Sequence, residues 1–317
     1  MSVEVFSLGE ILVDIIPVEP GSYVDGKLFE IHFGGAPANV AIGIARLGHR
    51  AGFIGAVGND PFGEMLRSFL EMEGVDTKGV VVKKARTTLA FVILQKGGER
   101  DFFFYRLPWT ETADTMLKPE DIDLSLVSKA KVLHISGVAT AFPPLSEAVY
   151  IAMRHAFDNR LHVSFDPNYR GDIWGSGRRA LETMDRFLKV TTLLTMGLDE
   201  VVNMFGSEDY RAVAENVMEM YRNIQYVAIR LGKRGAYVKS REKEVYVPAF
   251  EINAVDTTGA GDAWTAAFIV FYFLEKKDLE IAVRLSNAFA ALKCLRRGAV
   301  TGIPRRRELE EFTKNIR

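Results

Sequence analysis

Short apolar segments alternate with segments of helical periodicity along most of this chain, and this alternation limits the folds it can adopt. Apolar strands separated by helices favour a parallel sheet that is covered on both faces. In such sheets, ligands bind at the carboxyl ends of the strands. We expect strands at residues 3–8, 51–57, 132–136, 161–165, 193–196 and 226–229, and helices at 36–47, 61–73, 145–157, 178–190 and 209–222.

Two segments, 11–33 and about 87–107, depart from this alternation. Both have the pattern of antiparallel strands without an intervening helix, and Lys96-Gly97-Gly98-Glu99 has the composition of a hairpin turn. We expect the two segments to form a small β lid inserted into the α/β domain. The alternative is a pair of extra edge strands on the main sheet.

The composition excludes several classes of protein. The chain has 317 residues, a net charge of −1 and one cysteine, Cys294. A charge this small predicts no nucleic-acid or anionic-membrane partner. A lone cysteine rules out an internal disulfide framework and a cysteine-based zinc site, and it fits a cytoplasmic protein. The longest apolar run, 266–274, is too short to span a bilayer.

The segment Asp256-Thr-Thr-Gly-Ala-Gly-Asp262 precedes an apolar run and predicts an anion pocket at the start of a helix. Its glycines let the backbone approach a ligand closely. The first amides of a helix lack partners within the helix, and the helix dipole favours negative charge there. A carboxylate beside such a pocket suits a general base, which makes Asp262 the candidate. The alternative is an ordinary glycine-rich loop with Asp256 as the helix cap.

A second glycine pair, Gly34-Gly35, opens another expected helix, with Asn39 in its first turns. Asparagine is a poor residue inside a helix, because its side chain competes for backbone hydrogen bonds. We therefore expect its amide to reach a group outside the helix, and a polyol hydroxyl would suit it. A structural cap is the alternative.

Two shorter segments are weaker candidates. Asp166-Pro-Asn-Tyr-Arg170 follows an expected strand, where polar groups favour a ligand site and Arg170 can neutralise phosphate; the alternative is a turn with a surface arginine. The segment 230–235 is compatible with a nucleotide-facing turn or with a plain β-turn. The P-loop, the dinucleotide-binding fingerprint, the zinc-protease motif and the nucleophile elbow are all absent from the sequence.

Together these segments resemble the ribokinase-like sugar kinases, or PfkB carbohydrate kinase family, over essentially the whole chain. The amino-terminal signature matches 34–41, with Gly48 and Gly58 downstream, and the carboxy-terminal signature matches 256–262. The resemblance implies one domain, 1–317, with a three-layer α/β/α fold, a mostly parallel central sheet and a small β-sheet lid. Within the family, two motifs are similar to those of fructokinases: residues 100–108 followed by Ala113-Asp114, and residues 166–170 followed by Trp174. The 2-keto-3-deoxygluconate kinases share much of the second motif.

The resemblance implies transfer of the γ-phosphoryl group of ATP to a sugar hydroxyl, with Mg²⁺. Asp262 matches the catalytic base, and Gly259, Ala260 and Gly261 match the anion hole. The implied sugar-binding residues are Asp14, Gly34, Gly35, Asn39, Arg106, Asn168 and Arg170. The implied nucleotide-binding residues are Arg230, Gly232, Gly235 and Asn287. The candidate metal residues are Glu200, Asp256 and Thr258, the last two for a monovalent cation such as K⁺.

The chain departs from the family pattern at two positions. The family often has an asparagine three residues before a glutamate. This chain has the glutamate, Glu200, but Gly197 in place of the asparagine, so the network around Mg²⁺ must differ. Arg230 stands where a small hydroxyl residue is common, and its charge either adds a phosphate contact or alters the turn.

The sequence predicts a fructokinase that makes fructose 6-phosphate. One alternative is a 2-keto-3-deoxygluconate kinase, in which Arg106 or Arg170 would hold the substrate carboxylate. Another PfkB-family sugar or nucleoside kinase and a non-catalytic sugar sensor are further alternatives. We also expect a homodimer formed through the lid, because an exposed sheet edge has unpaired backbone groups that need partners.

Overall fold

A computed structural model describes residues 2–94 and 100–314. Within them, one large sheet has the strand order β13-β12-β11-β10-β9-β8-β1-β4-β5. Its strands pair in parallel, except β12 with each of its two neighbours. The mostly parallel sheet expected from the alternation is therefore confirmed. The strands are β1 (Val5–Leu8), β4 (Ala51–Gly58), β5 (Asp76–Lys83), β8 (Val132–Ser136), β9 (His162–Asp166), β10 (Leu193–Gly197), β11 (Tyr226–Arg230), β12 (Ala236–Ser240) and β13 (Glu244–Val247).

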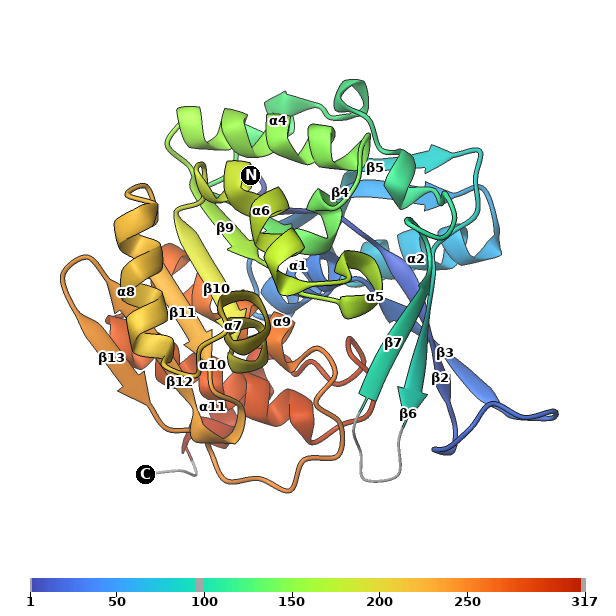
Figure 1. Cartoon of the computed structure of the whole chain (residues 1–317). Helices are drawn as coiled ribbons and strands as arrows, with labels where there is room; N and C mark the ends of the chain where they lie inside the picture. Colours follow the sequence, from blue (N-terminus) through green and yellow to red (C-terminus); the bar gives the residue numbers. More distant parts are fainter. Residues whose placement is uncertain (1, 95–99, 315–317) are drawn as a thin grey trace.

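Helices cover both faces of this sheet (Figure 1). One apolar core lies between the sheet and α4, α6, α7 and α8, and a second lies between the sheet and α1, α2, α9 and α10. The result is the three-layer arrangement that was expected. The helices are α1 (Ala36–Arg46), α2 (Pro61–Met72), α3 (Leu124–Val127), α4 (Leu145–Asp158), α5 (Gly171–Trp174), α6 (Gly177–Leu188), α7 (Leu198–Phe205), α8 (Tyr210–Met220), α9 (Ala260–Phe268), α10 (Leu279–Cys294) and α11 (Arg306–Lys314).

The two irregular segments form a separate four-stranded sheet, with the order β3-β2-β6-β7, rather than extra edges of the main sheet. We call it the lid sheet; it comprises β2 (Leu12–Pro17), β3 (Phe29–Gly34), β6 (Leu89–Leu94) and β7 (Arg100–Tyr105). Its pairs are antiparallel except β2 with β6, which is parallel, so the purely antiparallel expectation was wrong there. The chain passes through the main sheet between those two strands. The hairpin turn predicted at 96–99 lies outside the described residues.

Side chains alternate across the lid sheet, and the register decides which of them face inward. Asp14, Ala90 and Phe104 share one row, whereas Ile15, Phe91 and Phe103 share the next row on the opposite face. Asp14, Ala90 and Phe104 are buried. The lid sheet thus presents a carboxylate toward the interior of the protein.

Helices α1 and α9 pack against each other, and glycines shape both of their starts. Gly35 caps α1 with φ 106°, and a Cβ there would lie 2.6 Å from the Glu10 carbonyl oxygen. Gly259 caps α9 in the left-handed region, with φ 75°. The amino termini of the two helices belong to the two glycine motifs found in the sequence. No helix among the described residues is long and apolar enough to cross a membrane.

Candidate active site

The two glycine motifs meet through a hydrogen bond between their helices. Asn39 Nδ2 donates to Asp262 Oδ2 over 2.7 Å, from the first turn of α1 to the first turn of α9. The amide of Asn39 therefore leaves its own helix, as its unfavourable position predicted. Burial raises the pKa of Asp262 to about 6, although the Asn39 hydrogen bond pulls in the opposite direction. A carboxylate with that pKa is ionised at neutral pH and remains basic enough to take a proton.

The lid sheet brings a second carboxylate toward this pair. Asp14 is buried, and a Cβ on Gly34 would lie 2.6 Å from its Oδ2 atom, so glycine at 34 makes the space for it. Burial raises the pKa of Asp14 to about 7; Arg170 lowers it, and the charges of Asp262 and Asp256 raise it further. These mutual influences place Asp14 in the same electrostatic environment as the candidate base.

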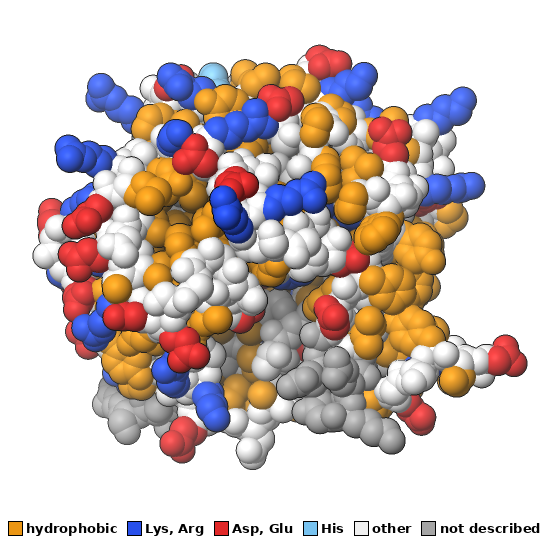
Figure 2. Space-filling view, in the orientation of Figure 1, with side chains coloured by type: hydrophobic (Ala, Val, Ile, Leu, Met, Phe, Trp, Pro, Cys, Tyr) orange, Lys and Arg blue, Asp and Glu red, His pale blue; other side chains and the backbone are white. Residues whose placement is uncertain are grey.

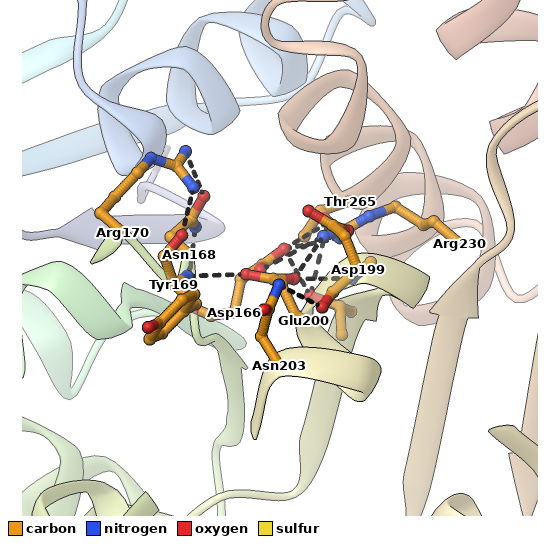
Figure 3. A network of polar contacts seen from close by, with 11 residues as sticks. Asp166, Asn168, Tyr169, Arg170, Asp199, Glu200, Asn203, Arg230 and Thr265 are labelled. Carbon is orange, nitrogen blue, oxygen red and sulfur yellow. Dashed lines mark hydrogen bonds and ion pairs between the residues drawn. The ribbon is translucent and has the colours of Figure 1, made fainter. Parts of the chain in front are cut away.

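Arg230 forms the centre of a buried polar network between β9, α7 and β11 (Figure 3). Its guanidinium donates to Asp166 Oδ2 over 2.6 Å and to Oδ1 over 3.3 Å, and it lies 3.5 Å from Glu200 Oε2. Burial alone would raise the pKa of Asp166, but Arg230 outweighs it and holds that pKa below its usual value. Burial and repulsion from Asp166 raise the pKa of Glu200 to about 7.

The same guanidinium borders the glycine motif at the start of α9. A Cβ on Gly261 would lie 3.3 Å from Cζ of Arg230, so the arginine lies against the candidate anion hole. Arg230 also donates to the Thr265 hydroxyl of α9 over 3.1 Å. Its charge is thus partly balanced by two carboxylates while one side of it faces the backbone of Gly261.

The loop after β9, with Asn168, Tyr169 and Arg170, lies beside the Arg230 network (Figure 3). Tyr169 N donates to Glu200 Oε1 over 2.8 Å, and Asn168 adopts a positive φ of 45°. Arg170 donates to the Tyr169 carbonyl and to Asn168 Oδ1, over 2.9 and 3.4 Å. Its guanidinium carbon lies 5.7 Å from the ring centre of Phe102 on β7. This loop therefore links the lid sheet to the network around Glu200.

Arg106, expected to contact substrate, is 1% exposed and pairs with Asp114 over 2.9 Å. The hydroxyls of Thr88 and Thr112 also donate to Asp114. Glu10 lies near the pair, and burial raises its pKa to about 7 against the lowering effect of Arg106. Substrate contact by Arg106 stays a prediction. The pairing of Asp114 with Arg106 and the presence of Glu10 were not foreseen.

Asp256 and Thr258 join a cluster separate from Glu200. Asp256 Oδ1 accepts from Thr258 N and Oδ2 accepts from Gly298 N, each over 2.8 Å. Lys293 Nζ donates to the Asp256 carbonyl oxygen over 2.6 Å. Among the residues that the structure describes, no three His, Cys, Asp or Glu side chains gather as a metal site. The predicted metal residues thus stay predictions.

The predicted nucleotide residues lie at the end of β11 and on α10. Gly232 and Gly235 have φ of 59° and 110° in the turn after β11, and a Cβ on Gly235 would lie 2.1 Å from the Val247 carbonyl oxygen. Asn287 donates to the Val247 carbonyl over 3.0 Å and accepts from Trp264 Nε1 over 2.8 Å. Its amide therefore fixes the end of β13 against α9 and α10.

Comparison with known proteins identifies the family. Residues 3–306 match the model of the pfkB family carbohydrate kinases. Fructokinase-1 of Oryza sativa subsp. japonica is 34% identical, over 95% of this chain and 94% of the relative. A sugar kinase of Pyrococcus horikoshii, solved in complex with ATP, has a TM-score of 0.83 and 34% identity, with 97% of each chain covered.

A fructokinase of Vibrio cholerae O395, solved with fructose, ADP and a calcium ion, has a TM-score of 0.86 and 30% identity, with 98% of each chain covered. The matched region includes both glycine motifs, the lid sheet and the Arg230 network. With its three layers, its small second sheet and the meeting of α1 and α9 at Asp262, this chain belongs to the pfkB family of carbohydrate kinases.

Proposed function

We propose that this protein transfers the γ-phosphoryl group of ATP to fructose and produces fructose 6-phosphate. The observation that carries the proposal is the contact between Asn39 and Asp262 at the start of α9, because it places an ionisable base in the first turn of that helix. Nucleotide and fructose in the structures of related kinases support the choice of substrates.

The chemistry follows from these groups. Asp262 accepts the proton of the sugar hydroxyl as the oxygen attacks the γ-phosphorus, and the bond to the bridging oxygen breaks to release ADP. The amides of 259–261 stabilise the negative charge on the group in transfer. Arg230, against Gly261, adds positive charge on the same side. We assign the turn at Gly232 and Gly235 to the nucleotide, with Asn287 behind it.

Magnesium enters this scheme with the nucleotide. Both carboxylate oxygens of Glu200 already accept hydrogen bonds from backbone N–H groups, those of Tyr169 and Gly197. The remaining lone pairs therefore suit water-mediated contact with the ion better than direct coordination of it. Glu200 would hold the ion in that way. When bound, Mg²⁺ neutralises charge on the β- and γ-phosphate oxygens.

The buried Arg106 and its acidic neighbours favour a neutral sugar over a sugar acid as the substrate. Asp114 balances the charge of Arg106, and the adjacent Glu10 adds a second acidic group, so this corner holds no surplus positive charge for a substrate carboxylate. Asp14, near the candidate base, would also repel a carboxylate when it is ionised. A hydroxyl, by contrast, can donate to Asp14 and to the free Oδ1 atom of Asn39.

The second candidate is a 2-keto-3-deoxygluconate kinase, and Arg170 is the residue that favours it. Arg170 lowers the pKa of both Asp14 and Asp262, so its positive charge reaches the site.

The deciding experiment compares kcat/KM for fructose, 2-keto-3-deoxygluconate, ribose, glucose and adenosine with MgATP. A hundredfold preference for fructose, or about 2.7 kcal/mol, supports the proposal. A preference for the keto acid refutes the fructokinase proposal. If no compound of the panel is phosphorylated, the result favours a non-catalytic sugar sensor.

The outward face of the lid sheet supports the proposed homodimer. Phe91 and Phe103 stack with ring centres 5.0 Å apart, and Ile31 and Tyr105 beside them are 53% and 55% exposed. Figure 2 shows hydrophobic side chains gathered over the lid strands. We propose that a second copy covers this face. Light scattering at micromolar concentration should give twice the chain mass, and Ile31→Lys should halve it; a monomeric wild type would contradict the proposal.

A further inference from the structure

The loop that leads into the candidate anion hole is held by a buried ammonium group. Lys293, in the last turn of α10, is 0% exposed. Its Nζ atom lies 2.6 Å from the Asp256 carbonyl oxygen, 3.4 Å from the Arg296 carbonyl oxygen and 3.8 Å from Asp256 Oδ1. A buried charge persists only when oxygen atoms compensate it, and these three oxygens belong to two loops that are far apart in sequence.

An ammonium group and a potassium ion are stabilised by the same kind of protein environment. Both carry one positive charge, and both are stabilised by carbonyl and carboxylate oxygens that replace water. Asp256, together with Thr258, is where the family resemblance implies a monovalent cation, and the Asp256 carbonyl oxygen already accepts a short, charge-assisted hydrogen bond from the lysine. A second cation on those oxygens would lie beside the first and be repelled. The residues present do not fit K⁺ at this place.

The space around the ammonium is closed by the chain itself. A Cβ on Gly302 would lie 3.0 Å from Cε of Lys293 and 3.0 Å from its carbonyl oxygen, so the 298–302 segment packs directly on the side chain. Gly298 N donates to Asp256 Oδ2 from the same segment. The lysine, the Asp256 loop and this segment therefore form one packed unit.

We propose that Lys293 is a built-in cation that replaces a monovalent metal ion and positions the loop before the anion hole, so that this kinase works without K⁺. Asp256 Oδ1 accepts from Thr258 N, and Gly259 follows at once as the cap of α9. Fixing Asp256 thus fixes the peptides that precede the phosphoryl-binding amides. The inference rests on the proposed phosphoryl transfer for its effect on rate, but not for its effect on cation binding.

The experiment compares the wild type with Lys293→Ala, Lys293→Met and the control Lys277→Ala, whose side chain is exposed. Turnover is measured with MgATP and the best sugar of the panel in KCl, NH₄Cl, NaCl and tetramethylammonium chloride of equal ionic strength. The melting temperature of each substrate-free variant is measured across the same salts, because an ion that binds only the folded state raises it saturably.

For the wild type and for Lys277→Ala, the turnover of each protein should vary less than twofold among the four salts. Lys293→Ala should lose at least tenfold in kcat in tetramethylammonium, with a smaller change in KM, and K⁺ or NH₄⁺ should restore a large part of both rate and melting temperature. Lys293→Met fills the space without charge and should be slow in every salt.

Two results would overturn the proposal: a wild-type rate that rises tenfold or more with K⁺, or a Lys293→Ala variant as fast as the wild type in tetramethylammonium. If neither lysine variant folds, salt dependence of the wild-type rate still decides. If no sugar of the panel is phosphorylated, the proposed function has failed, whereas K⁺-specific stabilisation of Lys293→Ala still tests the cation site.

Discussion

At the scale of single residues, the Asn39–Asp262 hydrogen bond sets the acidity of the candidate base. The amide stabilises the ionised carboxylate, so it lowers the pKa of Asp262 from the still higher value that burial alone would give. The base must be ionised to accept a proton. Turnover should therefore fall as the pH drops through about 6, where Asp262 takes up its proton.

Asn39→Ala should move this acidic limb to higher pH, because the variant loses the bond that favours the ionised form. The measurement is kcat/KM for the sugar between pH 5 and 9 in both proteins. Asp14 and Glu200 also titrate near pH 7, but only the Asp262 midpoint depends directly on Asn39. Asn203→Ala, at an exposed asparagine, is the matched control. An unchanged midpoint in Asn39→Ala would assign the limb to another group.

Asp262→Asn should lower kcat by about 10²- to 10⁴-fold, the usual contribution of a general base, while ATP binding stays nearly unchanged. The amide keeps the size of the side chain and leaves the α9 amides in place. Steady-state kinetics and calorimetric titration with the nucleotide measure the two effects. The control is Asp199→Asn, an exposed aspartate near Glu200 that should retain normal turnover. Near-normal turnover of Asp262→Asn would refute the role of the base.

Individual functional groups were easier to predict from the sequence than the residues that they pair with. Asp262 and Asn39 stood out because each is unusual where it stands, one beside an anion pocket and the other inside a helix. The contact between Arg230 and Asp166 joins different strands, and no local pattern records it. The same holds for Arg106 and Asp114, which pair within a buried loop. Partners of this kind depend on the folded arrangement.

At the scale of elements, the close packing of α1 on α9 holds the two halves of the site in register. Gly43 lies beneath Ala266, and a Cβ on Gly43 would come within 2.7 Å of the Ala266 Cβ. Even a small side chain there must push the helices apart. Because Asn39 and Asp262 lie on these two helices, such a shift would lengthen their hydrogen bond.

Gly43→Val should therefore destabilise the protein by about 1–3 kcal/mol and also reduce turnover more than tenfold in the molecules that remain folded. Chemical denaturation gives the first quantity, and kinetics at a temperature well below the melting point gives the second. Gly171→Ala is the control, because a Cβ on that first residue of α5 would meet nothing within 4 Å. Stability loss without loss of turnover would separate the packing from the site.

The regular elements were largely predictable, and the exceptions have physical reasons. Expected strands and helices at the centre of the chain lie within one or two residues of those observed, since buried strands and amphipathic helices have distinct periods. The edge strand β5 begins with the polar residues Asp76, Thr77 and Lys78, which masked it. The parallel pairing of β2 with β6 joins segments far apart in sequence, and hairpin patterns say nothing about such pairs.

At the scale of the whole molecule, buried carboxyl groups make stability depend on pH. Burial raises the pKa of Glu10 to about 7, from an ordinary value of 4.5. Between these two pH values the folded protein binds this proton and the unfolded chain does not, so the group lowers stability as the pH rises through the window. His134, whose pKa burial lowers to about 4, acts in the opposite direction below pH 6.5.

Glu10→Gln removes one such group, and its stability relative to the wild type should increase as the pH rises from 5 to 8. The expected gain is about 1–3 kcal/mol, since each unit of pKa corresponds to about 1.4 kcal/mol and the range from pH 5 to 7 spans about two units. Urea denaturation of both proteins at pH 5, 6, 7 and 8 gives the difference, in which the contribution of His134 cancels. A constant difference across this range would contradict the role of Glu10.

The bond between Asn39 and Asp262 joins residues that are 223 positions apart, and this separation matters during synthesis. A ribosome adds about 5–20 residues per second, so roughly 10 to 45 seconds pass between the two residues. By the end of that interval the chain contains the residues of its lid sheet and of its whole central sheet, but not yet the candidate base. The first and the last parts of the candidate site to be made are therefore α1 and α9, and the site is complete only when α9 packs on α1.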